Sequence, residues 1–465
     1  MKVKILGAAG NVTGSKFLLD TGKCRVMIDC GIYQERSLKN RNWEKFPVEP
    51  SSIDSILLTH AHLDHCGYLP RLVRDGFKGS IFCTEPTLDI VRITLLDSGK
   101  IQEEDAMKKR ERHEREGRKT EHPVEPLYTA EDAEKVFPLL RGFPYKKSVE
   151  VGDGITASFH DAGHILGAAM IEIEVKEAGR PKKIIFSGDI GRWDKPVLGD
   201  PSLFDEADVV FMESTYGDRV HETEAEAGKE LARVINETSG RGGNIVIPTF
   251  AIERAQELLF FLSGFLRDDI IPHLLVFVDS PMAINVTEVF KKYPEYFDAE
   301  TRDMIKKGSS PFDFSMLKLT RSVDESKAIN HIKGSSIIMA GSGMCTGGRI
   351  KHHLIANITR PESTVAFVGY QARGTLGRVI VEKADRVRIL GKQYPVRASI
   401  ENIGGFSAHA DKNELLRWVE GFKKPPGKIF VIHGEEEAAA NFASILERKK
   451  TSEIVVPAYL DEYSL

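Results

Sequence analysis

The sequence is poor in cysteine and has no long apolar run. Its 465 residues include five cysteines, which are scattered along the chain and form no CxxC pair. Such a set argues against a disulfide framework and a zinc finger, and predicts reduced thiols in a cytosolic protein. No stretch approaches the roughly 20 apolar residues of a membrane span, and the first residues lack the apolar run of a signal peptide. We therefore expect a cytoplasmic protein with no membrane segment.

Neither sign of charge dominates the composition. Lys and Arg number 64 against 68 Asp and Glu, so the formal net charge is 64 − 68 = −4. This balance argues against a histone-like or tail-driven nucleic-acid binder but leaves a local basic groove open. Hydrophobic residues make up 41% and charged residues 28%, which predicts a folded chain with a sizeable core. The length suggests two or three domains, and the sequence has no repeat or low-complexity linker.

The hydrophobic pattern changes along the chain. Short β-rich runs ended by Gly, Asp or Asn fill the first hundred residues, and strands return after about Lys392. Between them, strands such as Asn244–Phe250 and Thr364–Tyr370 alternate with helical stretches such as Glu253–Leu266. This alternation predicts a parallel α/β sheet, which binds ligands beyond the carboxyl ends of its strands. Residues 100–120 are dense in both charges, which favours a solvated helix over a surface for an anionic substrate.

The strongest local signal is THAHLDHCG at 59–67, directly after the apolar strand SILLT. It places His60, His62, Asp64 and His65 within six residues. Imidazole and carboxylate ligands suit Zn²⁺, and less often Mn²⁺ or Fe²⁺. A lone histidine is usually structural, but four such groups at HxHxDH spacing predict a metal site.

Further ligands have to come from elsewhere, because one loop cannot complete two metal shells. His164 in DAGHILG, Asp189 in FSGDIG and His433 in FVIHGE each follow an apolar strand at a Gly-containing turn. Each alone could be a turn residue, but together they make three further candidates of metal-ligand type. The chain has no GxSxG nucleophile elbow and no HExxH zincin motif.

These motifs together resemble the metallo-β-lactamase fold. The segments ESTYG (213–217), FSAHAD (406–411) and IHGE (432–435) resemble the β-CASP nucleases within it, as do GAAGNVTGS (7–15) and IDCG (28–31). The pattern is similar to bacterial and archaeal homologues of the 73-kDa subunit of the cleavage and polyadenylation specificity factor. The resemblance implies a metallo-β-lactamase αβ/βα sandwich over 1–208 and 392–465, with an inserted parallel-sheet α/β β-CASP domain over 209–391.

The resemblance also implies roles for individual residues and two Zn²⁺ per chain, with Mn²⁺ as a possible substitute. Asp29 would fix ligand tautomers from behind the metal shell. Glu213 would hold His409 protonated as the general acid for the leaving 3′-oxygen, and Asp64 could also orient the attacking hydroxide. The metal ligands would be His60, His62 and His164 for one zinc, Asp64, His65 and His433 for the other, and Asp189 between them. Candidate phosphate contacts are Ser342, Gly343, Arg349 and Arg373.

The implied activity is zinc-dependent hydrolysis of RNA in RNA processing or decay, by a two-metal mechanism. The resemblance implies an endonuclease, and an additional 5′-to-3′ exonuclease activity stays open. Whether the protein forms a homodimer also stays open. RNA is favoured over DNA because His433 stands where DNA-repair relatives have an apolar residue. Relative to RNase J-type and archaeal homologues, we expect neither an added C-terminal domain nor an N-terminal RNA-binding extension, so the RNA would be held mainly by the two domains.

Three alternatives stay open at this point. One is a small-molecule hydrolase of the same superfamily that acts on a thioester or a lactam, and a second is a DNA nuclease. The third is a non-enzymatic scaffold subunit, although such relatives lose metal ligands and all seven positions are filled here.

Three aromatic residues could stack on bases of the substrate, namely Tyr216, Phe250 and Tyr370. Each is more typical of a residue in the hydrophobic core.

Overall fold

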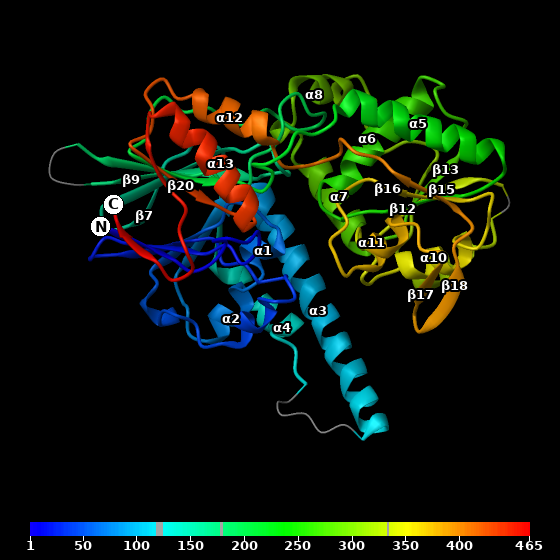
Figure 1. The fold of residues 1–465 in the computed structure, drawn as a ribbon, viewed down its shortest axis with the longest axis horizontal. Helices are drawn as coiled ribbons and strands as arrows, with labels where there is room; N and C mark the ends of the chain where they lie inside the picture. The colour runs from blue at the N-terminus through cyan, green and yellow to red at the C-terminus, as the bar shows by residue number, and fades with distance from the viewer. Residues whose placement is uncertain (118–123, 177–179, 333) are drawn as a thin grey trace. The chain divides into compact units, whose positions relative to one another are not determined.

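The computed structural model describes residues 1–117, 124–176, 180–332 and 334–465 (Figure 1). The chain forms two compact units. The first unit comprises Met1–Trp193, Asp200–Val220 and His409–Leu465, and the second comprises Asp194–Gly199 and His221–Ala408. By contacts, 209–220 therefore lie in the first unit and 392–408 in the second. The domain boundaries expected at 208 and 391 stay a prediction.

The first unit contains two seven-stranded sheets. One has the order β22-β1-β2-β3-β4-β5-β6, with the bounds Glu462–Ser464, Lys2–Ile5, Phe17–Asp20, Arg25–Ile28, Ser55–Leu57, Ser80–Thr84 and Leu140–Phe143. The other has the order β21-β20-β11-β10-β9-β8-β7, with the bounds Glu453–Val455, Lys428–Ile432, Val209–Glu213, Lys182–Phe186, Ala169–Val175, Ile155–Asp161 and Val149–Gly152. Apolar side chains from both sheets form one buried core.

Aromatic rings form the centre of this core. Phe186 stacks on Phe211 with ring centroids 4.3 Å apart, and Phe211 stacks on Phe430 at 4.5 Å. These residues come from the neighbouring strands β10, β11 and β20, while Phe17 of the other sheet packs against the first two. In β8 buried residues alternate with partly exposed ones, as expected of a strand with one face on a core. The two sheets are therefore held face to face by apolar contact.

Helices pack on the strands of these sheets. The helix α3 packs on β5 and β6, and α13 packs on β20 and β21. The charged segment around 100–116 is helical as expected, since it is the distal half of α3; residues 118–120 of that prediction lie outside the described residues. The helices are α1 Leu63–Cys66, α2 Leu69–Arg74, α3 Glu85–Glu116, α4 Ala130–Glu134, α12 Lys412–Glu420 and α13 Glu436–Lys449.

The second unit is built on a six-stranded sheet in which every paired strand is parallel. The order is β14-β13-β15-β12-β16-β19, with the bounds Leu317–Leu319, Leu275–Val278, Ser336–Ala340, Ile245–Pro248, Thr364–Phe367 and Ser399–Asn402. Its helices are α5 Glu224–Gly240, α6 Arg254–Arg267, α7 Pro281–Lys292, α8 Ala299–Lys306, α9 Val323–Ile329, α10 Ile350–Asn357 and α11 Leu376–Val381. The expected alternation of strand and helix is therefore correct.

The remaining elements are short. An antiparallel hairpin pairs β17 (Arg386–Ile389) with β18 (Lys392–Pro395). Within the described residues, 3₁₀ turns span Lys39–Trp43, Pro50–Ser52, Phe137–Leu139 and Pro294–Tyr296. The expectation of strands after Lys392 was incomplete, because α12 and α13 also form there, and α12 begins with an Asp411–Glu414 capping box that signals a helix start. Among the described helices, none is long and apolar enough to cross a membrane.

Candidate metal centre

The candidate ligands lie in the turns that follow strands of the first unit. His60 and His62 come after β4, and Asp64 and His65 lie on α1, the short helix that the HxHxDH segment opens. His164 follows β8, Asp189 follows β10 and His433 follows β20. Apolar strands thus fix the backbone of each turn, and the polar side chains converge at the strand ends.

Two glycines let these turns approach one another. A Cβ on Gly31 would lie 1.5 Å from the carbonyl oxygen of Asp64, and a Cβ on Gly191 would lie 1.8 Å from that of Gly163. No other residue fits such contacts, so the IDCG turn rests on the backbone of the HxHxDH segment. The turn after Asp189 likewise rests on the turn that carries His164.

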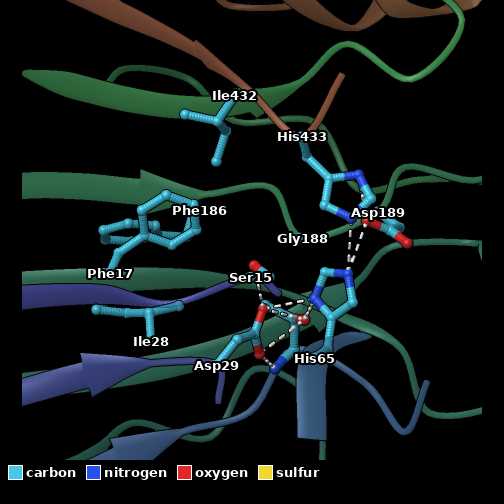
Figure 2. Close-up of a pocket in the computed structure, with 11 residues that line it drawn as sticks. Ser15, Phe17, Ile28, Asp29, His65, Phe186, Gly188, Asp189, Ile432 and His433 are labelled. Atoms are coloured by element: carbon cyan, nitrogen blue, oxygen red, sulfur yellow. Dashed lines mark hydrogen bonds and ion pairs between the residues drawn. The ribbon is translucent and has the colours of Figure 1, made fainter. Parts of the chain in front are cut away.

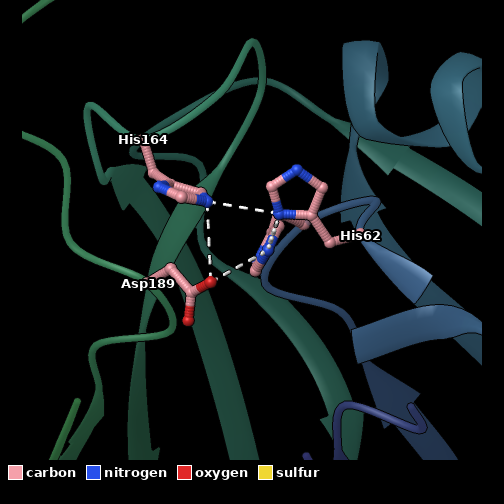
Figure 3. Close-up of side chains that lie close together, drawn as sticks. His62, His164 and Asp189 are labelled. Atoms are coloured by element: carbon pink, nitrogen blue, oxygen red, sulfur yellow. Dashed lines mark hydrogen bonds and ion pairs between the residues drawn. The ribbon is translucent and has the colours of Figure 1, made fainter. Parts of the chain in front are cut away.

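One cluster brings together three imidazoles and a carboxylate (Figure 3). Ligand atoms of His60, His62, His164 and Asp189 all lie within 4.8 Å of one another. His62 Nδ1 lies 3.0 Å from His60 Nε2 and 3.3 Å from His164 Nε2. The same two Nε2 atoms lie 3.4 and 3.5 Å from Asp189 Oδ2. This is the donor set and spacing that a single cation would draw together.

A second cluster shares Asp189 with the first (Figure 2). Ligand atoms of Asp64, His65 and His433 lie within 4.8 Å of one another. The Nε2 atoms of His65 and His433 are 3.0 Å apart. His433 Nε2 also lies 3.8 Å from Asp64 Oδ2. Asp189 Oδ1 lies 3.3 Å from His65 Nε2 and 3.5 Å from His433 Nδ1. The two oxygens of Asp189 therefore face different clusters.

The protonation of the first cluster suits metal binding. Burial lowers the pKa of His60 to about 3 and that of His62 to about 4, and it lowers the pKa of His164 well below its ordinary value. These imidazoles are neutral at neutral pH, which is the form that binds a metal. Burial also opposes charge on His65 and His433, but the Asp189 carboxylate beside them raises the pKa of each.

The residues present fit a divalent cation. Asp189 Oδ1 is buried and accepts no hydrogen bond in the described part of the chain, and the two imidazole nitrogens nearest to it lie 3.3 and 3.5 Å away. A buried carboxylate oxygen without a hydrogen bond is costly, and a bound cation would compensate for it. The imidazole nitrogens that face one another cannot all donate, so a shared positive charge accounts for their convergence better than a hydrogen-bond network. Nitrogen donors with few carboxylates favour zinc over calcium or magnesium.

Asp29 supports the second cluster from behind (Figure 2). Its Oδ2 lies 2.7 Å from His65 Nδ1, and its Oδ1 accepts the Thr59 N–H at 2.8 Å. A proton held on His65 Nδ1 leaves Nε2 free to bind a metal, which is the usual role of such a carboxylate. The hydroxyl of Thr59 also contacts Asp29 and lies 3.0 Å from His60 Nδ1. Sequence reasoning missed Thr59, although its place directly before the first ligand was the available signal.

Glu213 and His409 form a pair beside the first cluster. Both oxygens of Glu213 approach His409 Nδ1, at 3.3 and 3.2 Å, and one of them also accepts the Ile190 N–H. Burial opposes charge on His409, but Glu213 and Asp189 raise its pKa to about 9. Its Nε2 lies 3.9 Å from Asp189 Oδ2. Ligand atoms of Glu213, Asp189 and His433 also lie within 4.8 Å of one another, so Glu213 could in principle bind a metal. Because both of its oxygens contact His409, we interpret it as the partner of that imidazole instead.

The four candidate phosphate contacts all lie in the second unit, beyond strand ends. Arg349 is held in place, because its guanidinium donates to the Asp279 carboxylate and to the carbonyl oxygens of Thr320 and Arg321. Ser342 Oγ accepts the Gly347 N–H at 3.2 Å, and Gly343 is buried. Arg373 is exposed. Their role in binding phosphate stays a prediction, which the geometry favours least for Arg349.

Comparison with known proteins decides the family. Residues 18–208 match the metallo-beta-lactamase superfamily domain, 255–380 match the Beta-Casp domain, and 393–457 match the Zn-dependent metallo-hydrolase RNA specificity domain. Ribonuclease TTHA0252 of Thermus thermophilus is 37% identical over 446 residues, which cover 96% of each chain. The chain belongs to the β-CASP family of the metallo-β-lactamase superfamily. This assignment confirms the predicted fold class and the predicted class of enzyme, a metal-dependent hydrolase.

Other relatives agree with this assignment. Transcription termination factor FttA of Methanocaldococcus jannaschii is 32% identical, with 99% of this chain and 71% of FttA covered. An RNase J-like protein of the same organism is 31% identical, with 95% and 94% covered. Among solved structures, a protein of unknown function from Enterococcus faecalis matches with a TM-score of 0.56 and 12% identity, over 100% of this chain and 99% of that one. At that identity the likeness concerns the fold alone.

Proposed function

We propose that this β-CASP protein is a zinc-dependent ribonuclease that hydrolyses phosphodiester bonds of single-stranded RNA in the cytoplasm. The observation that carries the proposal is Asp189, whose two oxygens face two separate groups of ligand atoms. Two metals that share a carboxylate suit an in-line displacement at phosphorus. The relative named as a ribonuclease, which aligns over nearly the whole chain, supports RNA as the substrate.

The ligands would divide between two zinc ions. One ion would be held by His60, His62 and His164. The other would be held by Asp64, His65 and His433. Asp189 would contact both. When bound, the ions would supply Lewis-acid stabilisation of the phosphate charge and would lower the pKa of water near neutral. Mn²⁺ accepts similar ligands, so it could substitute for zinc.

The side chains around the ligands carry the remaining chemistry. Glu213 accepts the Nδ1 proton of His409 in a hydrogen bond and so stabilises the imidazolium. The separate proton on Nε2 would pass to the leaving 3′-oxygen, which would otherwise depart as an unstable alkoxide. Asp64 is about one-fifth exposed and can accept a hydrogen bond from the attacking water. Asp29 holds the Nδ1 proton of His65 so that the other nitrogen stays available.

The test is cleavage of a 5′-labelled single-stranded RNA, with the same sequence as DNA alongside, in zinc and after chelation. The proposal expects RNA-selective cutting that chelation stops and zinc restores. Internal products would indicate endonuclease action, and released mononucleotides would indicate 5′-to-3′ exonuclease action. Zinc content of the purified chain gives the stoichiometry, and light scattering tests for the homodimer.

The same assay separates the alternatives. Preferential cutting of the DNA would identify a DNA nuclease. A preparation with two zincs that cuts neither polymer but hydrolyses a chromogenic lactam or thioester would be a small-molecule hydrolase. Less than one zinc per chain and no cutting would favour a scaffold role.

A further inference from the structure

Two large aromatic side chains are exposed at the carboxyl edge of the sheet in the second unit. Phe250, two residues beyond β12, is 43% exposed, and Tyr370, three residues beyond β16, is 51% exposed. Strands β12 and β16 are neighbours in the sheet (Figure 1). They run parallel, with Ile245 opposite Thr364. Both rings therefore leave the sheet at the edge where such sheets bind ligands. The sequence prediction extended both strands over these residues, but each strand ends before its aromatic.

Backbone contacts fix the loops that carry these rings. A Cβ on Gly343 would lie 2.7 Å from Phe250 Cδ2, so the glycine lets the loop after β15 pack against one part of the ring. The buried side chain of Gln371 donates from Nε2 to the carbonyl oxygens of Gly343, at 3.1 Å, and Gly369, at 3.2 Å. Tyr370 thus lies between two anchored residues. The backbone on both sides of Tyr370 is therefore held in place before any ligand arrives, which reduces the entropy lost on binding.

A cation lies near these rings in the sequence. Arg373 follows Tyr370 by three residues, is exposed, and makes no hydrogen bond or ion pair within 1–117, 124–176, 180–332 and 334–465. The exposed guanidinium of Arg373 contrasts with that of Arg349, which forms an ion pair with the Asp279 carboxylate. A planar guanidinium without an internal partner suits a phosphate. Surfaces that bind single-stranded nucleic acid typically combine exposed aromatic faces with basic side chains, and the loop after β16 carries one of each, Tyr370 and Arg373.

We propose that Phe250, Tyr370 and Arg373 form a platform that stacks bases of single-stranded RNA and neutralises a phosphate between them. The proposal rests on the proposed function, because it assigns a binding surface for that substrate. Every base has an apolar face, so the platform holds RNA without reading its sequence. A stretch of RNA longer than the scissile dinucleotide is then needed for tight binding.

The first experiment measures stacking directly. Short single-stranded RNA with 2-aminopurine and nuclease-resistant phosphorothioate linkages is titrated with the zinc-loaded protein, because stacking on an aromatic ring quenches 2-aminopurine fluorescence. The proposal expects quenching by the wild type, a loss of quenching and about 10-fold weaker binding in Tyr370→Ala, and near wild-type behaviour in Tyr370→Phe. Phe250→Leu, which keeps an apolar side chain on Gly343, should also weaken binding. Val323→Ala, at another exposed apolar position of this unit, is the control.

The second experiment separates this proposal from the proposed function. Michaelis constants are measured for an RNA oligonucleotide and for bis(p-nitrophenyl) phosphate, a small diester without bases. Tyr370→Ala should raise KM for RNA by about 10-fold and leave hydrolysis of the small diester unchanged. Equal quenching and equal KM in wild type and Tyr370→Ala would overturn the platform even if RNA is cut. Quenching that depends on Tyr370 without any RNA cleavage would keep the platform and overturn the ribonuclease.

Discussion

Replacing Asp29 by Asn tests whether this carboxylate sets the tautomer of His65. The amide keeps an oxygen that can accept the Thr59 N–H, which Asp29 Oδ1 accepts at 2.8 Å. Its NH₂ group then faces His65 Nδ1, where the carboxylate oxygen now lies 2.7 Å away. A donor at that place favours the proton on Nε2, which can then no longer bind a metal. Asn is preferable to Ala here because Asp29 has φ 57°, and Asn tolerates this left-handed conformation.

The expected loss of zinc affinity in Asp29→Asn is limited to one of the two metal sites. Removing a carboxylate behind a metal-binding histidine typically weakens metal affinity by roughly 10- to 100-fold, or about 1.4–2.7 kcal/mol. Only the site that contains Asp64, His65 and His433 should lose this affinity. The hydrogen bonds of Asp29 reach the other site only through the Thr59 hydroxyl, so the three-histidine site should change much less.

The assay is a zinc titration of the metal-free protein by calorimetry, combined with RNA cleavage at limiting and at excess zinc. Asp29→Asn should bind one zinc as tightly as the wild type and a second one more weakly, and excess zinc should restore much of its cleavage. Ser15→Ala is the control, since its hydroxyl lies 3.4 Å from Asp29 Oδ2 and contributes little. Two wild-type affinities in Asp29→Asn would refute the reasoning, and so would an equal loss at both sites.

Three further changes probe the same centre. Asp64→Ala should abolish RNA cleavage while the circular dichroism spectrum stays native, and residual activity above a few per cent would count against two metals. His409→Ala should slow single-turnover cleavage by roughly 10²- to 10⁴-fold with unchanged zinc content, because the leaving 3′-oxygen would lose its proton donor; an unchanged rate would remove His409 as the general acid. Thr59→Val should lower the free energy of unfolding by about 1–2 kcal/mol in urea titrations, since the Asp29 carboxylate loses a buried donor; an unchanged midpoint would contradict this.

Much of the centre could be predicted because each candidate follows an apolar strand. Strands such as β4 and β10 are recognisable from their runs of Ile, Leu and Phe, and the polar residue at the end of such a run has few structural uses. The positions of His60, His164 and Asp189 beyond strand ends were therefore expected from the sequence. Their approach to within a few ångströms was expected only from the family resemblance, since no local pattern encodes which turns meet.

Other features could not be predicted for physical reasons. The exposure of Phe250 and Tyr370 depends on where β12 and β16 end, and an apolar run gives no sign of where pairing stops. Arg349 was expected to contact substrate phosphate only from the family resemblance, and that role stays a prediction. Its guanidinium donates to Asp279, 70 residues earlier in the chain, and such a partner is set by tertiary packing.

His409 and Asp189 are linked through the backbone of Ile190. Its N–H donates to a Glu213 carboxylate oxygen, and its carbonyl oxygen accepts the Ala410 N–H at 2.8 Å. Ile190 directly follows Asp189, and Ala410 directly follows His409. The N–H and the carbonyl oxygen of Ile190 therefore hold Glu213 and His409 close to the Asp189 carboxylate. His409 is the first residue of the first unit after the chain leaves the second. Its place beside Asp189 is nevertheless fixed by bonds within the first unit. The bonds through Ile190 involve no residue of the second unit, so we expect sequence changes there to leave His409 beside Asp189.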